Sequence, residues 1–295
     1  MGRREVMSEP YDMVNSRSSQ QDLSHPSGDY QHLGRGEPVS RVAPLPAGQR
    51  GAGWDLAGVT ALARKLDSLC ELSSADQVAL SEMPTRRGAA PAGADLVGKG
   101  ERLDAVRMVV SGWACHYHTL DDGRRQISAF LLPGDFCNPP GGGGDQGLDH
   151  GVGALTRVTV ADMPPAILAS VAEAHPAVGQ AMTLAARAEQ AVLRRWVVNL
   201  GALSGGQRIA HLFCELAARL GSIGMVKAGA FEMPLTQAVL AETCGLSPVH
   251  MNRVLQHLRS ENLIQLDRRR LTILDEPRLQ AVAGFRADYL KLRTA

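Results

Sequence analysis

The sequence predicts an α+β fold, in which an amino-terminal roll of short strands precedes a long helix, two short helices and a hairpin. Three observations support this expectation. Short β-rich runs separated by Gly, Pro and Asp fill residues 85–163. An uninterrupted helical pattern covers residues 176–200. Residues 235–260 have the pattern of two helices joined by a tight turn at Gly245.

Composition limits the class of protein. The chain has 295 residues, of which 44% are hydrophobic and 21% charged, as in an ordinary globular protein of two modest domains. Its apolar runs are too short for a membrane span and its start lacks a signal-peptide core, so we expect a cytoplasmic protein. The cysteines are odd in number and scattered, which predicts reduced thiols without a disulfide framework or zinc site: Cys70, Cys115, Cys137, Cys214 and Cys244.

Four segments are expected along the chain. Residues 1–52 are rich in Ser, Gln, Gly, Pro and Arg and are predicted to form a disordered arm. Residues 53–170 form the roll domain, 171–202 a long helix and 203–295 a carboxy-terminal domain. Within the second segment, a helical stripe from Leu56 to Leu69 is followed by a capping pattern that begins at Ser73.

The roll is predicted from four runs and their turns. The runs are Ala105–Val110, Ala114–Leu120, Gln126–Leu131 and Ala154–Ala161. Repeated short strands of this kind favour a double-stranded, jelly-roll-like β-roll. Asp121-Asp122-Gly123 is a hairpin signal, because its turn type needs positive φ.

The long helix carries an apolar stripe close to a heptad repeat. Its length and its position between two domains favour a dimer seam over packing within one chain. The residues expected at this seam are Val178, Met182, Ala185, Val192 and Trp196.

The paired helices near the carboxyl end suit a DNA groove. Ser247 can cap the second helix, and Pro248 occupies a position where a missing amide hydrogen costs nothing. The apolar residues Met251, Val254, Leu255 and Leu258 form one stripe. The opposite face carries Val249, Asn252, Arg253 and Gln256, which combine one charge, hydrogen-bonding groups and an apolar tip. The sequence therefore predicts that this helix contacts DNA bases.

A hairpin is expected after these helices, with Arg268, Arg269 and Arg270 at its tip. Taken by itself, a run of three arginines is best interpreted as a solvent-exposed turn. Beside a recognition helix, the three arginines favour contact with phosphates.

This order of elements resembles the Crp/Fnr family of bacterial transcription regulators over residues 54–292. Gly100-Glu101, Ser111-Gly112-Trp113 and Pro133-Gly134-Asp135 look like the turn glycines of the family's sensor roll, and Gly245-Leu-Ser with Asn252-Arg253 matches its DNA-binding motif. The resemblance implies a homodimer that binds a pseudo-palindromic site, with RNA polymerase as a further partner. The DNA-contacting residues expected are Thr236, Gln237, Ser247, Pro248, Val249, His250, Asn252, Arg253, Gln256, Arg268, Arg269 and Arg270.

The sensor roll departs from the cyclic-AMP-binding members. Those members carry an Arg followed by Ser or Thr in a phosphate-binding cassette, but no Arg or Lys lies between Gly134 and Gly153 here. We therefore expect no control by cyclic AMP, because a guanidinium fork is hard to replace. Residues 1–69 lack the cysteines of iron–sulfur members, and Pro139 stands where haem-binding members have His. His116 and His118 are interpreted as surface polar residues, so no cofactor or metal is predicted.

Two alternatives stay open at this stage. Cys244 is either a small buried residue or a thiol whose oxidation switches off DNA binding. The chain is either a functional regulator or an effector-binding sensor, for redox, haem or a small ligand, with a vestigial DNA-binding domain. No nucleophile–base pattern or Walker-type loop predicts an enzyme.

Overall fold

A computed structural model describes residues 57–138, 140 and 147–293. The predicted arm of residues 1–52 and the first apolar position of the opening helix lie outside the described residues. No helix in the described ranges is long and apolar enough to cross a membrane.

The helices are α1 (Ala57–Asp67), α2 (Ser74–Ser81), α3 (Pro165–Ala174), α4 (Pro176–Ala202), α5 (Gly205–Ser222), α6 (Gln237–Cys244), α7 (Pro248–Ser260), α8 (Glu276–Ala283) and the 3-10 helix η1 (Ala287–Leu290). The strands are β1 (Arg86–Ala90), β2 (Asp95–Val97), β3 (Val106–Ser111), β4 (Ala114–Thr119), β5 (Arg125–Leu131), β6 (Gly151–Ala154), β7 (Val158–Met163), β8 (Ala230–Glu232), β9 (Ile264–Asp267) and β10 (Arg270–Ile273).

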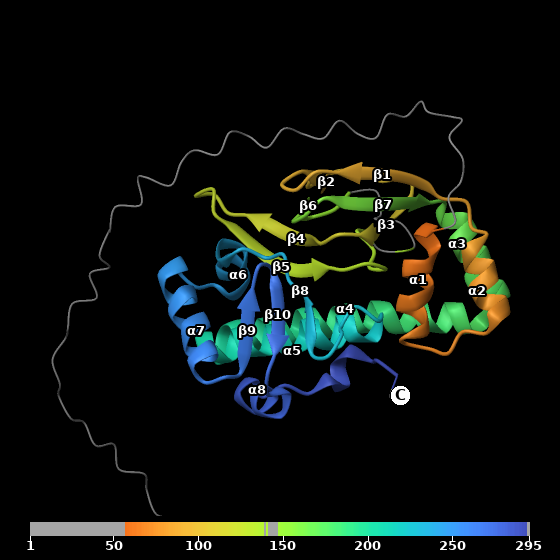
Figure 1. The fold of residues 1–295 in the computed structure, drawn as a ribbon. Helices are drawn as coiled ribbons and strands as arrows, with labels where there is room; N and C mark the ends of the chain where they lie inside the picture. Colours follow the sequence, from red (N-terminus) through yellow and green to blue (C-terminus); the bar gives the residue numbers. More distant parts are fainter. Residues whose placement is uncertain (1–56, 139, 141–146, 294–295) are drawn as a thin grey trace, which may run out of the picture. The chain divides into compact units, whose positions relative to one another are not determined.

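The roll consists of two antiparallel sheets with strand orders β1-β7-β3 and β2-β6-β4-β5 (Figure 1). Its interior is filled by small and branched residues such as Val109, Val152 and Val160. The β4–β5 hairpin turns at Asp121-Asp122-Gly123 with φ of 82° at the glycine, as predicted. Ser73 caps α2 by accepting a bond from the Asp76 amide at 3.2 Å, which confirms the capping pattern.

The strand predictions were incomplete in two respects. The expected run Ala154–Ala161 is divided, because Leu155–Arg157 form a turn between β6 and β7. β1 and β2 were missed, since β1 is rich in Arg, Gly and Ala and β2 has three residues. Short strands without an alternating apolar pattern give little sequence signal.

The predicted seam on α4 requires a correction. Val178, Val192 and Trp196 are buried within their own chain, and Met182 and Ala185 are half-buried. Trp196 is only 7% exposed, because it packs edge-on against Phe130 of the roll with ring centroids 5.7 Å apart. This stripe therefore joins α4 to its own domain, and the large exposed apolar side chains of α4 are others: Leu193, Val197 and Val198.

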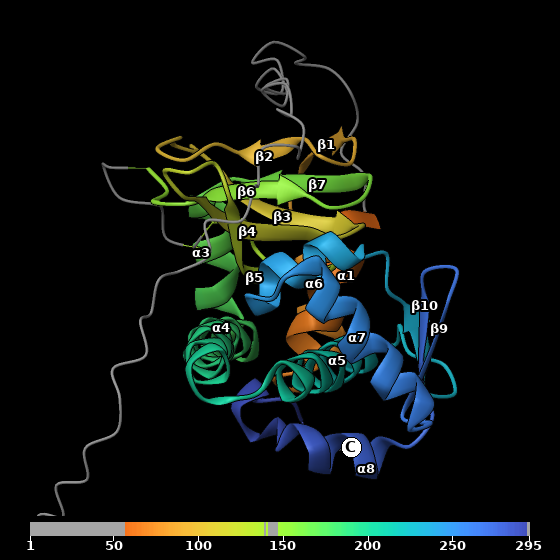
Figure 2. The ribbon, with the colours of Figure 1, turned by 90° about the vertical axis from the view of Figure 1, so that its left-hand side faces the viewer.

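The carboxy-terminal domain places α6 and α7 beside a three-stranded sheet of order β8-β10-β9 (Figure 2). Met251, Val254, Leu255 and Leu258 of α7 are buried in its core, as the stripe predicted. α5 begins directly after the cap Ser204, so Gly205 and Gly206 lie in its first turn.

Candidate nucleic-acid interface

The turn between α6 and α7 is set by local backbone chemistry. Gly245 ends α6 in the left-handed region with φ of 60°, which a residue with a side chain adopts only with strain. Ser247 then caps α7, accepting a hydrogen bond from the His250 amide at 3.2 Å, and Pro248 follows in the first turn. The start of α7 is thus fixed as the sequence predicted.

The outer face of α7 combines polar and apolar side chains. Asn252, Arg253 and Gln256 are exposed, and Val249 at the start of the helix is 72% exposed. Arg253 has no ion pair with another described residue. Exposed amide and guanidinium groups can form hydrogen bonds with base edges in a major groove. An exposed apolar side chain such as Val249 can contact a thymine methyl.

The hairpin β9–β10 carries the arginine tip. Arg268 and Arg269 both have positive φ, 43° and 69°, as the two central residues of a tight hairpin turn do. Arg270 lies within β10, where its cross-strand neighbours are Asp267 and Glu232. The three arginines are therefore not equivalent, because acidic residues flank Arg270 on both sides.

All the residues predicted to contact DNA are exposed, but their positions differ. Thr236 caps α6 by accepting from the Val239 amide at 3.2 Å, and Gln237 follows it. His250 lies against the first turn of α5, since a Cβ on Gly205 would come within 2.9 Å of its Nε2. The structure thus brings the α7 residues onto one helix and places the tip arginines on a separate hairpin.

Sequence reasoning missed the side chains that hold α6. Arg208 of α5 donates to the Leu203 and Cys244 carbonyl oxygens, each at 2.9 Å. From the roll, Arg125 pairs with Glu242 at 3.2 Å, and Gln126 donates to the Thr243 carbonyl at 3.3 Å. The sequence contains no pattern that would indicate contact between the β4–β5 hairpin and α6. These bonds connect the β4–β5 hairpin directly to the first helix of the motif.

The roll is also linked to α5, through a buried polar network. Glu215 accepts hydrogen bonds from Trp196 Nε1 at 3.1 Å and from the Tyr289 hydroxyl at 2.7 Å, and an Arg219 nitrogen lies 3.4 Å away. Arg219 also donates to the Phe130 carbonyl at 2.9 Å and to Asp135 at 2.8 Å. Burial raises the pKa of Glu215, whereas the charge of Arg219 acts in the opposite direction. The three side chains that bond to the carboxylate all act as donors.

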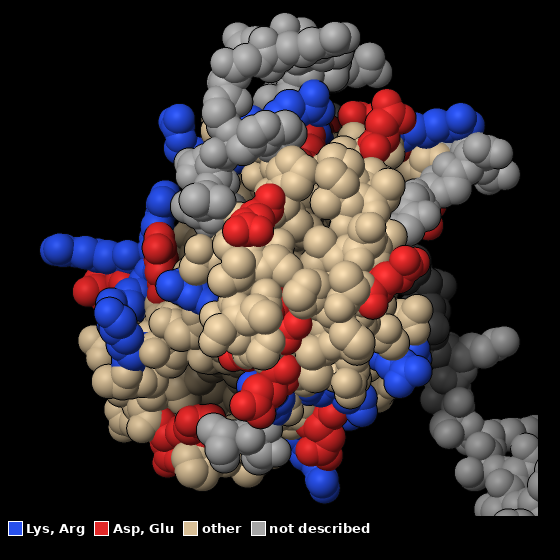
Figure 3. Space-filling model, turned by 90° about the vertical axis from the view of Figure 1, so that its right-hand side faces the viewer, with Lys and Arg blue, Asp and Glu red and all other residues tan. Residues whose placement is uncertain are grey.

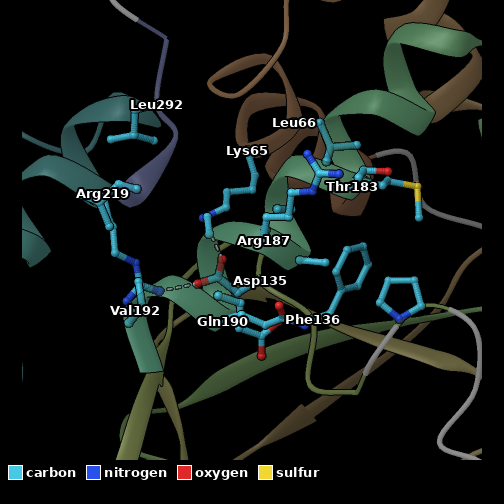
Figure 4. Close-up of a pocket in the computed structure, with 18 of the residues that line it drawn as sticks. Lys65, Leu66, Asp135, Phe136, Thr183, Arg187, Gln190, Val192, Arg219 and Leu292 are labelled. Atoms are coloured by element: carbon cyan, nitrogen blue, oxygen red, sulfur yellow. Dashed lines mark hydrogen bonds and ion pairs between the residues drawn. The ribbon is translucent and has the colours of Figure 1, made fainter. Parts of the chain in front are cut away.

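A cavity of about 650 Å³ lies between the roll and α4 (Figure 4). Asp135 projects into it from the turn at Gly134, and Lys65 pairs with this carboxylate at 2.9 Å. Burial alone would raise the pKa of Asp135, but Lys65 and Arg219 bring it below its ordinary value. The two cations that line the cavity near Asp135 are therefore already neutralised.

Three further arginines of the roll are also engaged. Arg107 binds Asp162 at 2.7 Å and the Leu96 carbonyl at 2.6 Å. Arg124 pairs with Asp122 at 2.7 Å, and Arg125 is committed to Glu242. Asn138, in the segment after Gly134 that has no Arg or Lys, is buried; it accepts a hydrogen bond from the Arg107 amide at 2.8 Å and donates one to the Ala105 carbonyl at 3.0 Å.

Cys244 is buried at the end of α6. Burial raises the pKa of its thiol to about 12, so the thiol is protonated at neutral pH. A protonated, enclosed thiol reacts slowly with oxidants, which favours the packing interpretation over the redox one.

The face opposite α7 has no continuous basic surface. Figure 3 shows a broad centre without Lys or Arg, in which scattered acidic residues occur, and basic residues toward its edges. This agrees with a net charge of +1. This face therefore offers no continuous positive surface that would attract DNA.

Two family models match the chain. Residues 89–175 match the cyclic nucleotide-binding domain, and residues 207–282 match the Crp-like helix-turn-helix domain. The first covers the roll and α3, and the second extends from α5 into α8.

Relatives and solved structures agree with these matches. The transcriptional activator protein FnrL of Cereibacter sphaeroides is 27% identical over 225 residues, covering 75% of this chain and 90% of the relative. Anr of Pseudomonas protegens is 26% identical over 218 residues, or 72% of this chain and 86% of the relative. In fold, FixK2 from Bradyrhizobium japonicum superimposes with a TM-score of 0.58 at 22% identity, covering 67% of this chain and 96% of that one. The chain therefore combines a cyclic nucleotide-binding domain with a Crp-like helix-turn-helix domain, and over most of its length it is similar to transcription regulators of the Crp/Fnr type.

Proposed function

We propose that this chain binds a pseudo-palindromic DNA site as a homodimer, through the exposed face of α7 and the tip of the β9–β10 hairpin. The observation that supports the proposal most is the unpartnered polar face of α7 beside two tip arginines. Two recognition helices related by a two-fold axis would enter successive major grooves, about one helical turn apart. Selecting bound fragments from a genomic library tests this, and a recovered motif without two-fold symmetry would contradict it.

The proposed segments follow the sequence expectation: a roll domain of residues 53–170, a dimer helix of residues 171–202 and a DNA-binding domain of residues 203–295. We infer a regulatory role without catalysis. The curated relatives FnrL and Anr are named as transcriptional activators. Recruitment of RNA polymerase is therefore part of the proposal, and transcription in vitro from a selected site tests it.

The dimer seam proposed on α4 is its exposed stripe. Ala186, Gln190, Leu193 and Val197 are spaced by four, three and four residues, and all are exposed. This is the spacing of the a and d positions in a two-stranded coiled coil. The seam thus lies beside the buried stripe that the sequence suggested.

Arg253→Ala should weaken binding to the selected site by about 1–3 kcal/mol, because a guanidinium on a recognition helix can bond two acceptors of guanine. The affinity is measured by fluorescence anisotropy at fixed salt. Arg102→Ala is a matched control, since Arg102 is exposed in the roll domain. Equal losses in the two variants, or no loss in the first, would remove Arg253 from base recognition.

The hairpin tip should act on all sequences alike. Arg268→Ala combined with Arg269→Ala is expected to reduce the slope of log affinity against log salt by about 1.8, if each arginine neutralises one phosphate. Arg270→Ala should change the slope less, because Asp267 and Glu232 flank it. Titrations at several salt concentrations, on specific and random duplexes, give the slopes. An unchanged slope in the double variant would exclude a phosphate role.

Cyclic AMP should not bind at sub-millimolar concentration. A buried cyclic phosphate needs a paired, buried cation, and Arg107, Arg219 and Lys65 are each engaged with a carboxylate. Arg187, which also lines the cavity, is an exposed residue of α4 and lies outside the roll. Titration calorimetry should show no heat, and the DNA affinity should be the same with and without the nucleotide. Micromolar binding that also tightened DNA binding would overturn this expectation.

A further inference from the structure

Three histidines, His116, His118 and His150, meet on one face of the roll. β4 and β6 pair so that His116 lies opposite Val152 and Tyr117 opposite Gly151. Extending this register by one residue places His150 opposite His118, with His116 diagonal to it on the same face. The sequence showed only the pair on β4. The third ring comes from the residue that precedes β6.

The rings are close enough to share one ion. The His116 and His150 ring centroids are 4.4 Å apart, and those of His118 and His150 are 6.0 Å apart. Two imidazoles bound to one tetrahedral ion through nitrogens at about 2.0–2.1 Å have ring centroids about 5 Å apart. Both observed separations lie near this value.

Burial distinguishes this cluster from surface polar residues. His116 is only 7% exposed, so its interpretation as a surface residue was wrong. The Nε2 atoms of His116 and His150 are both buried and neither has a hydrogen-bond partner among the described residues. A buried polar atom without a partner is costly, and an ion bound to both atoms would remove that cost.

An acidic neighbour orients one of these rings. His150 Nδ1 lies 2.6 Å from Asp149 Oδ1, and a carboxylate at this nitrogen keeps the ring proton on Nδ1. Nε2 of His150 then carries a free lone pair. A carboxylate bonded to the far nitrogen of a histidine is the usual arrangement around metal-binding imidazoles.

We propose that His116, His118 and His150 bind a divalent transition metal ion, with Asp149 as a positioning residue. Imidazole ligands suit Zn²⁺, Ni²⁺, Cu²⁺ and Fe²⁺ and exclude Mg²⁺ and Ca²⁺, which need oxygen ligands. No three ligands of the described ranges already surround one point. The ion must therefore draw in His118, whose exposed side chain is free to turn and leaves a path from solvent.

The test uses the full chain, freed of metal by a chelator. Zn²⁺ should bind with one ion per chain in competition with a chromophoric chelator, and Co²⁺ should give the intense visible absorption of a four-coordinate site. His116→Gln, His118→Gln and His150→Gln should each weaken binding at least 10-fold, and Asp149→Asn should weaken it about 10- to 100-fold. His257→Gln is the matched control, because this exposed histidine lies on α7.

Folding is monitored by circular dichroism in each variant. His118→Gln and Asp149→Asn change exposed side chains, so they keep the test valid if the buried variant His116→Gln unfolds. Binding that persists unchanged in His118→Gln and His150→Gln would overturn the proposal. A wild-type chain that binds no more Zn²⁺ than a variant lacking all three rings would also overturn it.

Discussion

Arg219→Met is expected to lower the free energy of unfolding by about 3–5 kcal/mol, because the change leaves the fully buried Glu215 carboxylate without its cation. Asp135 loses one of its two cations at the same time. Urea unfolding followed by tryptophan fluorescence measures the loss, and Trp196, which donates to Glu215, reports directly on the network.

Two comparisons separate the buried charge from a general effect of the substitution. Arg286→Met removes an arginine whose pair with Asp288 is exposed, and it should cost less than about 1 kcal/mol. Adding Glu215→Gln to Arg219→Met should restore part of the stability, since the orphaned charge is removed. A double variant less stable than Arg219→Met alone would show that Glu215 is not the source of the loss.

Val197→Asp is expected to convert the dimer into monomers that bind the DNA site poorly. Val197 is 72% exposed in the single chain, and a carboxylate buried there between two helices would cost about 3 kcal/mol in each copy. Because both copies of a two-fold dimer carry the substitution, the cost occurs twice, and the association constant should fall by about four orders of magnitude. Sedimentation velocity and DNA titration measure the two effects.

Val78→Asp is the matched control for this change. Val78 is an exposed valine on α2, so the same substitution there should leave both association and DNA binding unchanged. Leu193→Asp should resemble Val197→Asp, because it lies four residues earlier on the same stripe. If both α4 variants sediment as dimers, the seam is not on this face of the helix.

Strong local signals predicted much of the carboxy-terminal domain. The cap at Ser247, the tight turn at Gly245 and a periodic apolar stripe are properties of a few neighbouring residues, and each was found as expected. The same holds for the β4–β5 hairpin and the cap at Ser73.

The sequence could not show which partner an apolar stripe packs against. Val192 and Trp196 have the spacing of a dimer seam, yet Trp196 finds Phe130 and Glu215 within its own chain. The histidine cluster was missed for a similar reason. His116 and His150 are 34 positions apart in the sequence, and only the pairing of β4 with β6 brings them together.

The attachment of α6 to the roll sets an energy scale for signalling. One half-exposed ion pair, Arg125 with Glu242, and one hydrogen bond, Gln126 to the Thr243 carbonyl, are together worth about 1–3 kcal/mol. A signal that detaches the β4–β5 hairpin from this helix must overcome these polar contacts in addition to the apolar packing of β5 against α6. An effector that discriminates between the attached and released states by about 5- to 150-fold in affinity would offset the contribution of these two polar contacts.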